Sequence, residues 1–105
     1  MPWFIKTERF TQATLNLSSK KRSQFLAEHK SWIKNMQTQG KRIISGYLVN
    51  QKKEPGGGGL LVIEAESYQD AIHIIEQDPM IKNNLVKWTL QEWVLIENAF
   101  NNSII

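Results

Sequence analysis

Four segments of the chain are rich in apolar residues of the kinds that favour strands. Residues 3–10 are rich in aromatic and β-branched side chains and contain no glycine or proline, which is typical of a strand. Residues 41–50, 60–65 and 85–95 are also centred on β-branched, aromatic and other apolar side chains. Residues 11–19 are mostly polar and have no apolar period, so we expect a loop there.

A helix is predicted between the first two strands, because its apolar residues are spaced by three or four positions. They form one face that also carries a histidine: Phe25, His29, Trp32, Ile33 and Met36. Ser19 or Ser23 is expected to cap the start of this helix, and Gly40 is expected to end it.

A second helix is predicted after the third strand. Its apolar stripe consists of Tyr68, Ala71, Ile72 and Ile75. Ser67 is the expected N-cap, and Pro79 is expected to end the helix because the residue before a proline avoids the helical region. The glycine-rich run 55–59 predicts a flexible hairpin connection between the second and third strands.

The order β-α-β-β-α-β places the chain in the α+β class. Two right-handed crossovers in so short a chain interleave most simply as a ferredoxin-like domain. This arrangement has a four-stranded antiparallel sheet in the order 4-1-3-2 and two helices on one face. We expect one domain over residues 1–105, of which about 96–105 form a C-terminal tail.

The sheet face that the two helices leave uncovered is also expected to be apolar. A water-facing strand alternates apolar with polar residues, but residues 60–63 are all apolar, and residues 43–44 and 3–5 have the same character. Such a face would leave a large apolar patch on a monomer. We therefore predict a homodimer formed through this sheet face.

Composition and charge argue against several functional classes. Hydrophobic residues make up 41% of the chain and charged residues 22%, which is typical of a globular protein. The chain has no cysteine, no secretory signal pattern and no apolar run that could span a membrane, so we expect a cytoplasmic protein with no membrane partner. The net charge is only +3, and residues 60–65 lack the aromatic residues that stack on RNA bases. We therefore expect no nucleic-acid partner.

The two histidines are predicted to lie in opposite environments. His73 projects from the polar side of the second helix, whereas His29 lies within the apolar stripe of the first and must find a hydrogen-bond partner. One interpretation is a core histidine bonded to a backbone carbonyl. The other is a general base oriented by Asp78. Asp78 sits at the C-terminal end of the second helix, where a carboxylate opposes the helix dipole, so it is either a simple Asp-Pro helix stop or a functional residue.

Other kinds of site have weaker support in the sequence. The glycine-rich run lacks the Lys-Ser/Thr of a phosphate-binding loop and does not open a helix. A Ser-His-Asp triad that uses Ser45 is conceivable, but no strained nucleophile turn surrounds this serine. Two histidines on different helices, without clustered carboxylates, give no metal site, so we predict no metal and no cofactor.

Segments in both halves of the chain resemble the YciI-like (YCII-related) family in their order and spacing. The matching segments are 27–29, 32–33, 40–46, 59–65, 67–71 and 78–79. The resemblance implies a dimeric ferredoxin-like α+β barrel in which His29 and Asp78 form the proposed catalytic pair. Two departures from the family pattern, Tyr47 for a proline and Met80 for an aromatic residue, fall where a pocket is expected.

We predict that Ser45, Tyr47, Met80 and Trp32 bind the substrate. The leading hypothesis is a small lyase- or hydrolase-like enzyme that uses His29 and Asp78 for acid–base chemistry on an unknown small organic molecule. Most members of the family that the chain resembles have no assigned reaction. A few proteins of similar fold act in the breakdown of halogenated aromatics. The alternative is a non-catalytic dimeric module that binds a small ligand or another protein and in which His29 is structural.

Overall fold

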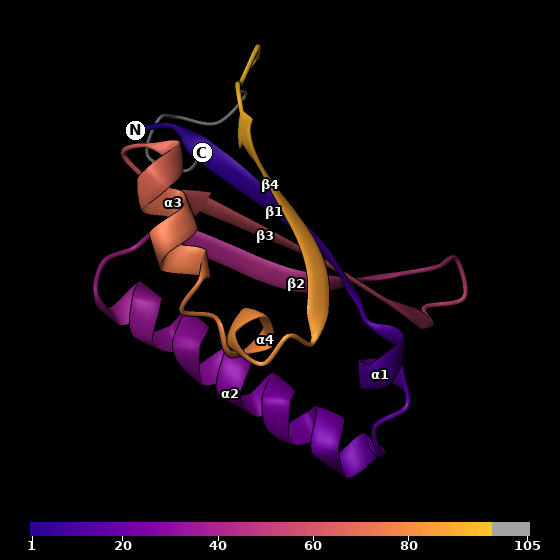
Figure 1. Cartoon of the computed structure of the whole chain (residues 1–105). Coiled ribbons are helices and arrows are strands. Elements are labelled where there is room, and N and C mark those ends of the chain that lie inside the picture. Colours follow the sequence, from indigo (N-terminus) through magenta and orange to yellow (C-terminus); the bar gives the residue numbers. More distant parts are fainter. Residues whose placement is uncertain (98–105) are drawn as a thin grey trace.

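The computed structural model describes residues 1–97, and its main elements follow the predicted order (Figure 1). Two short helices are added to that order. The elements are β1 (Trp3–Phe10), α1 (Gln12–Leu15), α2 (Ser19–Thr38), β2 (Ile43–Val49), β3 (Pro55–Glu64), α3 (Tyr68–Ile75), α4 (Pro79–Lys82) and β4 (Val86–Trp93). Beyond Glu97, the predicted C-terminal tail lies outside the described residues.

The four strands form one antiparallel sheet in the order β2-β3-β1-β4. This order is the predicted 4-1-3-2 arrangement read from the other edge, so the ferredoxin-like topology is confirmed. β1 is a central strand, and Lys6 near its middle lies opposite Leu61 of β3 and Leu90 of β4. A side chain on the inner face of β1 is therefore flanked by strands on both sides.

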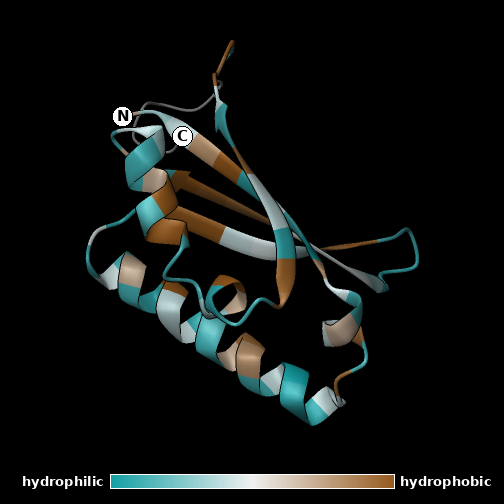
Figure 2. Cartoon of the chain, viewed as in Figure 1, coloured by the Kyte–Doolittle hydropathy of each residue, from teal (hydrophilic) through white to brown (hydrophobic). Residues whose placement is uncertain are grey.

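The core lies between the sheet and the helices α2 and α3, which cover the same face. Its buried side chains come from all four strands and both helices: Phe4, Trp32, Ile43, Leu61, Ile63, Ala65, Ala71, Ile75 and Leu90. Figure 2 shows the corresponding hydrophobic colouring on the central strands and on α3, whereas α2 is mostly hydrophilic. The long helix therefore contributes few core residues and presents a largely polar surface to solvent.

Side-chain caps fix the ends of the two longer helices. α2 is capped by Ser18, whose hydroxyl accepts a hydrogen bond from the Lys21 N–H, so the prediction of Ser19 or Ser23 was wrong by one residue or more. Gly40 follows the end of α2 with a φ of +85°, the left-handed conformation that glycine adopts most readily. The predicted cap of α3 is confirmed, because Ser67 accepts from the Asp70 N–H.

The segment predicted as a loop after β1 contains the short helix α1. Thr11 caps this helix by accepting from the Thr14 N–H. The buried Thr14 hydroxyl in turn donates to the carbonyl of Leu85 at 2.8 Å. Four residues are too few to show an apolar period, which is why the sequence pattern did not reveal them.

The glycine-rich run is part of β3 and is not a loop, which corrects the prediction. The hairpin turn lies earlier, at residues 50–54, where the Asn50 side chain accepts from the backbone N–H groups of Lys52 and Glu54. The pairing of β2 with β3 is irregular between Tyr47 and Val49, and Gly57 there has a φ of +78°. Glycine thus permits a bulge in a strand that is paired on both sides.

The sheet face opposite the helices carries exposed apolar side chains. Ile44 is 58% exposed and Leu60 is 36% exposed, and both lie on this face with the partly buried Ile5 and Val62. Trp3 on the same face is buried, with the Arg42 guanidinium 5.2 Å from its ring centre. The double-sided apolar character that the sequence predicts for the strands is therefore present in the structure.

Candidate active site

Asp78 is the N-cap of α4, which places its carboxylate inside the molecule. Its Oδ1 accepts a hydrogen bond from the Met80 N–H at 2.9 Å, and Pro79 occupies the first position of the helix. From the sequence, Pro79 was predicted to end the preceding helix and Asp78 to oppose the dipole of that helix. In the structure α3 already ends at Ile75, so the carboxylate instead caps the start of a new turn of helix.

His29 is bonded through both ring nitrogens to side chains from other elements. Its Nδ1 lies 2.8 Å from Oδ1 of Asp78, and its Nε2 lies 2.9 Å from Oγ of Ser45. The histidine side chain is 15% exposed, whereas Asp78 has no exposed surface. The structure thus brings together three of the predicted site residues, from α2, β2 and the start of α4.

A buried lysine that was not among the predicted site residues completes this group. Nζ of Lys6 lies 2.9 Å from Oδ2 of Asp78 and 2.6 Å from Oε1 of Glu8. The Lys6 side chain is fully buried. The sequence indicates the inward position of Lys6, because Phe4, Lys6 and Glu8 are two positions apart along β1. Side chains with this spacing lie on the same face of a strand, here the face that meets the helices.

These neighbours keep Asp78 ionised. Burial alone raises the pKa of the Asp78 carboxyl, but the hydrogen bond to His29 and the positive charge of Lys6 outweigh that effect. The pKa of Asp78 therefore lies below its ordinary value. At neutral pH the group is a carboxylate, which can only accept hydrogen bonds.

The ionised state of Asp78 determines which way the hydrogen bonds of His29 run. Because Asp78 can only accept, Nδ1 of the histidine carries the proton and donates it. In the neutral ring, Nε2 is then the acceptor and the Ser45 hydroxyl is the donor. The ring therefore offers a basic nitrogen on the side of Ser45, held in orientation by a carboxylate, which is the arrangement of a general base.

An open cleft of about 980 Å³ lies beside this group and is lined by α2, β2, β3 and β1. His29, Ser45 and Glu8 contribute to its lining. The larger apolar side chains that line it are Phe10, Leu26, Ile33, Tyr47 and Met80. A cleft of this size, mostly apolar with a few polar groups, is typical of a small-molecule site.

The predicted substrate-binding residues are placed in two different environments. Ser45, Tyr47 and Met80 line the cleft. Trp32 does not, because it is buried in the core, with its ring centre 5.9 Å from that of His29. Within residues 1–97 its indole N–H has no hydrogen-bond partner.

The glycine run of β3 forms part of the cleft wall and makes room for Glu8. Gly59 lies opposite Glu8 in the sheet. A Cβ atom at position 59 would lie 3.1 Å from Cγ of Glu8 and 3.3 Å from the carbonyl oxygen of Gly46. The absence of a side chain at this position thus allows Glu8 to reach Lys6.

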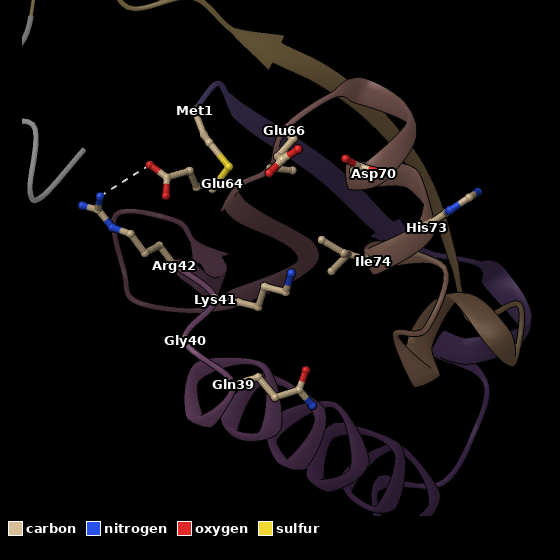
Figure 3. Close-up of a pocket in the computed structure, with 11 residues that line it drawn as sticks. Met1, Gln39, Gly40, Lys41, Arg42, Glu64, Glu66, Asp70, His73 and Ile74 are labelled. Carbon is tan, nitrogen blue, oxygen red and sulfur yellow. Dashed lines mark hydrogen bonds and ion pairs between the residues drawn. The ribbon is translucent and has the colours of Figure 1, made fainter.

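A second cavity, of about 490 Å³, lies at the C-terminal end of α2 (Figure 3). It is lined by side chains of both charges, including Asp70 and His73 of α3. Arg42 and Glu64 form an ion pair there at 3.4 Å. None of the lining residues belongs to the His29 group, and His73 is exposed, as predicted.

Within residues 1–97, no three histidine or acidic side chains are grouped so that they could hold a metal ion. No helix in that part of the chain is long and apolar enough to cross a lipid bilayer.

The fold and the site define a small ferredoxin-like α+β domain with a histidine–aspartate pair beside an open cleft. The chain belongs to the YCII-related domain family, whose model matches residues 3–93. This match confirms the resemblance noted in the sequence. No curated protein sequence matches the chain.

Solved structures of similar fold include natural and designed proteins. One is 5-chloro-2-hydroxyhydroquinone dehydrochlorinase (TftG) from Burkholderia phenoliruptrix AC1100, in complex with 2,5-dihydroxybenzoquinone. It has a TM-score of 0.66 and 20% identity, covering 88% of this chain and 93% of that one. A dimeric ferredoxin-like protein from an uncultured marine organism has a TM-score of 0.52 and 13% identity, covering 94% and 100%. The de novo design Ferredog-Diesel has a TM-score of 0.56 and 13% identity, covering 87% and 84%.

Proposed function

We propose that the protein is a small cytoplasmic enzyme that performs general acid–base chemistry on a small organic molecule bound in the His29 cleft. The observation that carries the proposal is the pair of hydrogen bonds made by His29, to the buried carboxylate of Asp78 and toward the cleft at Ser45. A structural histidine needs only one satisfied partner, such as a backbone carbonyl. Here both partners are side chains, and the ring lies at the wall of a cleft.

The chemistry follows from the proton positions. His29 takes a proton at Nε2 during the reaction, and its ring becomes a cation. Asp78 stabilises that cation through Nδ1, while Lys6 keeps Asp78 ionised from the other side. Proton abstraction, elimination of a leaving group and activation of water are all served by such a base, and the lyase- and hydrolase-like classes both fit.

The charges around the cleft favour an anionic ligand. Three cationic residues line it, Arg22, Lys30 and Lys34, whereas Glu8 is the one acidic residue in the described lining and is paired with Lys6. Together with the apolar wall, these charges suit a small molecule with an apolar or aromatic body and a negative group. The quinone bound by the structurally similar dehydrochlorinase supports this class as a starting point.

A matched pair of histidine variants tests the proposed function. The protein would be screened for binding and turnover with 2,5-dihydroxybenzoquinone and a panel of substituted hydroquinones and aromatic acids. His29→Ala is expected to abolish turnover of any hit while the circular dichroism spectrum is unchanged. His73→Ala, on the exposed side of α3, is expected to behave as wild type. Full activity of a folded His29→Ala variant would refute the proposal.

We also propose that the protein is a homodimer through the open sheet face. The support is the exposed apolar surface there, including Ile44 and Leu60, together with the dimeric description of one structural neighbour. Burying that surface against a second copy would remove it from water. Sedimentation at micromolar concentration is expected to give a dimer, and Ile44→Lys with Leu60→Lys is expected to give a folded monomer. A wild-type monomer would overturn this proposal.

A further inference from the structure

We infer that Ser45 is a nucleophile and that the protein transfers or hydrolyses acyl groups from small carboxylic esters or thioesters. This inference rests on the proposed function, since it uses the same base, His29, and assigns the group through which the base acts. The carrying observation is a continuous chain of hydrogen bonds from Asp78 through His29 to Ser45, with lengths of 2.8 and 2.9 Å.

The direction of these bonds activates the serine. Lys6 holds Asp78 as an anion, so the proton of the neutral histidine is on Nδ1 and the Nε2 lone pair faces the Ser45 hydroxyl. Serine hydroxyls are weak nucleophiles unless a base takes their proton as they attack. A carboxylate, an imidazole and a serine in this order define the same roles in unrelated hydrolases, whatever their fold or chain order.

The position of Ser45 presents its Oγ to the cleft as the reactive atom. Its hydroxyl is hydrogen-bonded to Nε2 of His29, so its proton is the one that this nitrogen can take directly. Ser45 itself lines the cleft and is only partly buried. It lies on β2, an edge strand of the sheet, so alternate backbone N–H groups along β2 are not used in pairing with β3. Acyl transfer needs such donors for the developing oxyanion.

The reaction balances without a cofactor. Oγ of Ser45 forms a bond to the carbonyl carbon of the ester, and its proton passes to Nε2 of His29. The bond from that carbon to the leaving oxygen or sulfur breaks, and the leaving group departs with the proton from Nε2. Water then attacks the acyl-serine, again giving its proton to His29, and Ser45 recovers a proton as the carboxylic acid is released.

A fluorophosphonate probe tests this assignment directly on the full-length protein. Such a reagent bonds through phosphorus to a nucleophilic serine oxygen and expels fluoride. We expect the intact mass of the wild-type protein to increase by one adduct, and peptide mapping to place it on Ser45. Ser45→Ala and His29→Ala are expected to remain unlabelled. Ser23→Ala is the control, because Ser23 is exposed on α2 and lies outside the cleft lining, and this variant is expected to label as wild type.

A second measurement separates this inference from the proposed function. With p-nitrophenyl acetate, a nucleophilic Ser45 is expected to give a burst of p-nitrophenol close to one equivalent, and Ser45→Ala is expected to lose it. No adduct on Ser45, or equal labelling in His29→Ala, would overturn the inference. If Ser45 stays unlabelled while His29→Ala still abolishes turnover of a non-ester hit, the base is correct and the nucleophile is not.

Discussion

Nζ of Lys6 lies 2.9 Å from Oδ2 of Asp78, and neither side chain has any exposed surface. A buried ion pair has value mainly because each charge would be costly without the other. Here the pair does more than satisfy two charges. Because Lys6 occupies one oxygen of Asp78, the other oxygen is left to orient His29, and the positive charge of Lys6 helps to lower the pKa of Asp78 from inside the core.

Asp78→Asn is therefore expected to destabilise the fold strongly. The substitution leaves the Lys6 ammonium without its buried carboxylate, which typically costs about 3–5 kcal/mol. Urea denaturation followed by circular dichroism measures the free energy of unfolding. Asp70→Asn is the control, because Asp70 is exposed at the first turn of α3 and its charge contributes no more than about 1 kcal/mol. Equal stabilities of the two variants would contradict the buried-pair account.

The lowered pKa of Asp78 predicts a loss of stability in acid. An unfolded aspartate titrates near about pH 3.9, and the folded carboxyl titrates below that value. The charged form thus stabilises the native state above the unfolded pKa, and this contribution disappears as the pH falls through the folded pKa. The free energy of unfolding of wild type is expected to fall more steeply between about pH 5 and pH 2 than that of Asp78→Asn. Parallel curves would refute this prediction.

Gly59 is expected to tolerate alanine poorly. A Cβ at this position would press on Glu8 and on the backbone of Gly46, and would disturb the Glu8–Lys6 contact. Gly56 in the same strand has open space around its Cβ position, so Gly56→Ala is the matched control. We expect Gly59→Ala to lower the melting temperature by several degrees and Gly56→Ala to leave it unchanged or slightly higher. Thermal unfolding measures both.

The three cationic residues that line the cleft, Arg22, Lys30 and Lys34, are expected to make it prefer anionic ligands. The fluorescent probes 1-anilinonaphthalene-8-sulfonate and N-phenyl-1-naphthylamine share an aromatic body but differ in charge. Lys30→Gln with Lys34→Gln is expected to weaken binding of the sulfonate by roughly 2- to 30-fold, given about 0.2–1 kcal/mol for each of the two exposed charges. Binding of the neutral amine is expected to be unchanged. Lys20→Gln, outside the cleft lining, serves as the control.

Much of the fold could be predicted because its signals are local and repeated. The period of the strands and helices gave the element order, and the chirality of the crossovers gave the sheet order. The same periods placed His29 among apolar neighbours, where it needed a partner. Asp78 was one candidate for that partner, with an Asp-Pro helix stop as the alternative, and its role as the cap of α4 was not predicted.

The features that were missed depend on contacts between distant residues. Glycines 56–59 look like a loop in sequence, but pairing with β1 and β2 holds them in a strand. The period of β1 indicates that Lys6 faces the helices, but its partner Asp78 lies 72 residues away in the chain and no local pattern identifies it. Local propensity cannot supply such information, because the free energy comes from tertiary pairing.

The position of the proton on the neutral His29 ring decides whether Nε2 can act as a base. Nitrogen-15 NMR of the labelled imidazoles distinguishes the two neutral tautomers by the chemical shifts and proton couplings of the ring nitrogens. We expect the neutral His29 ring to carry its proton on Nδ1, shared with Asp78, and Nε2 to be unprotonated and to face Ser45. A proton found on Nε2 of the neutral ring would contradict this expectation, because the nitrogen beside the cleft would then have no lone pair with which to act as a base.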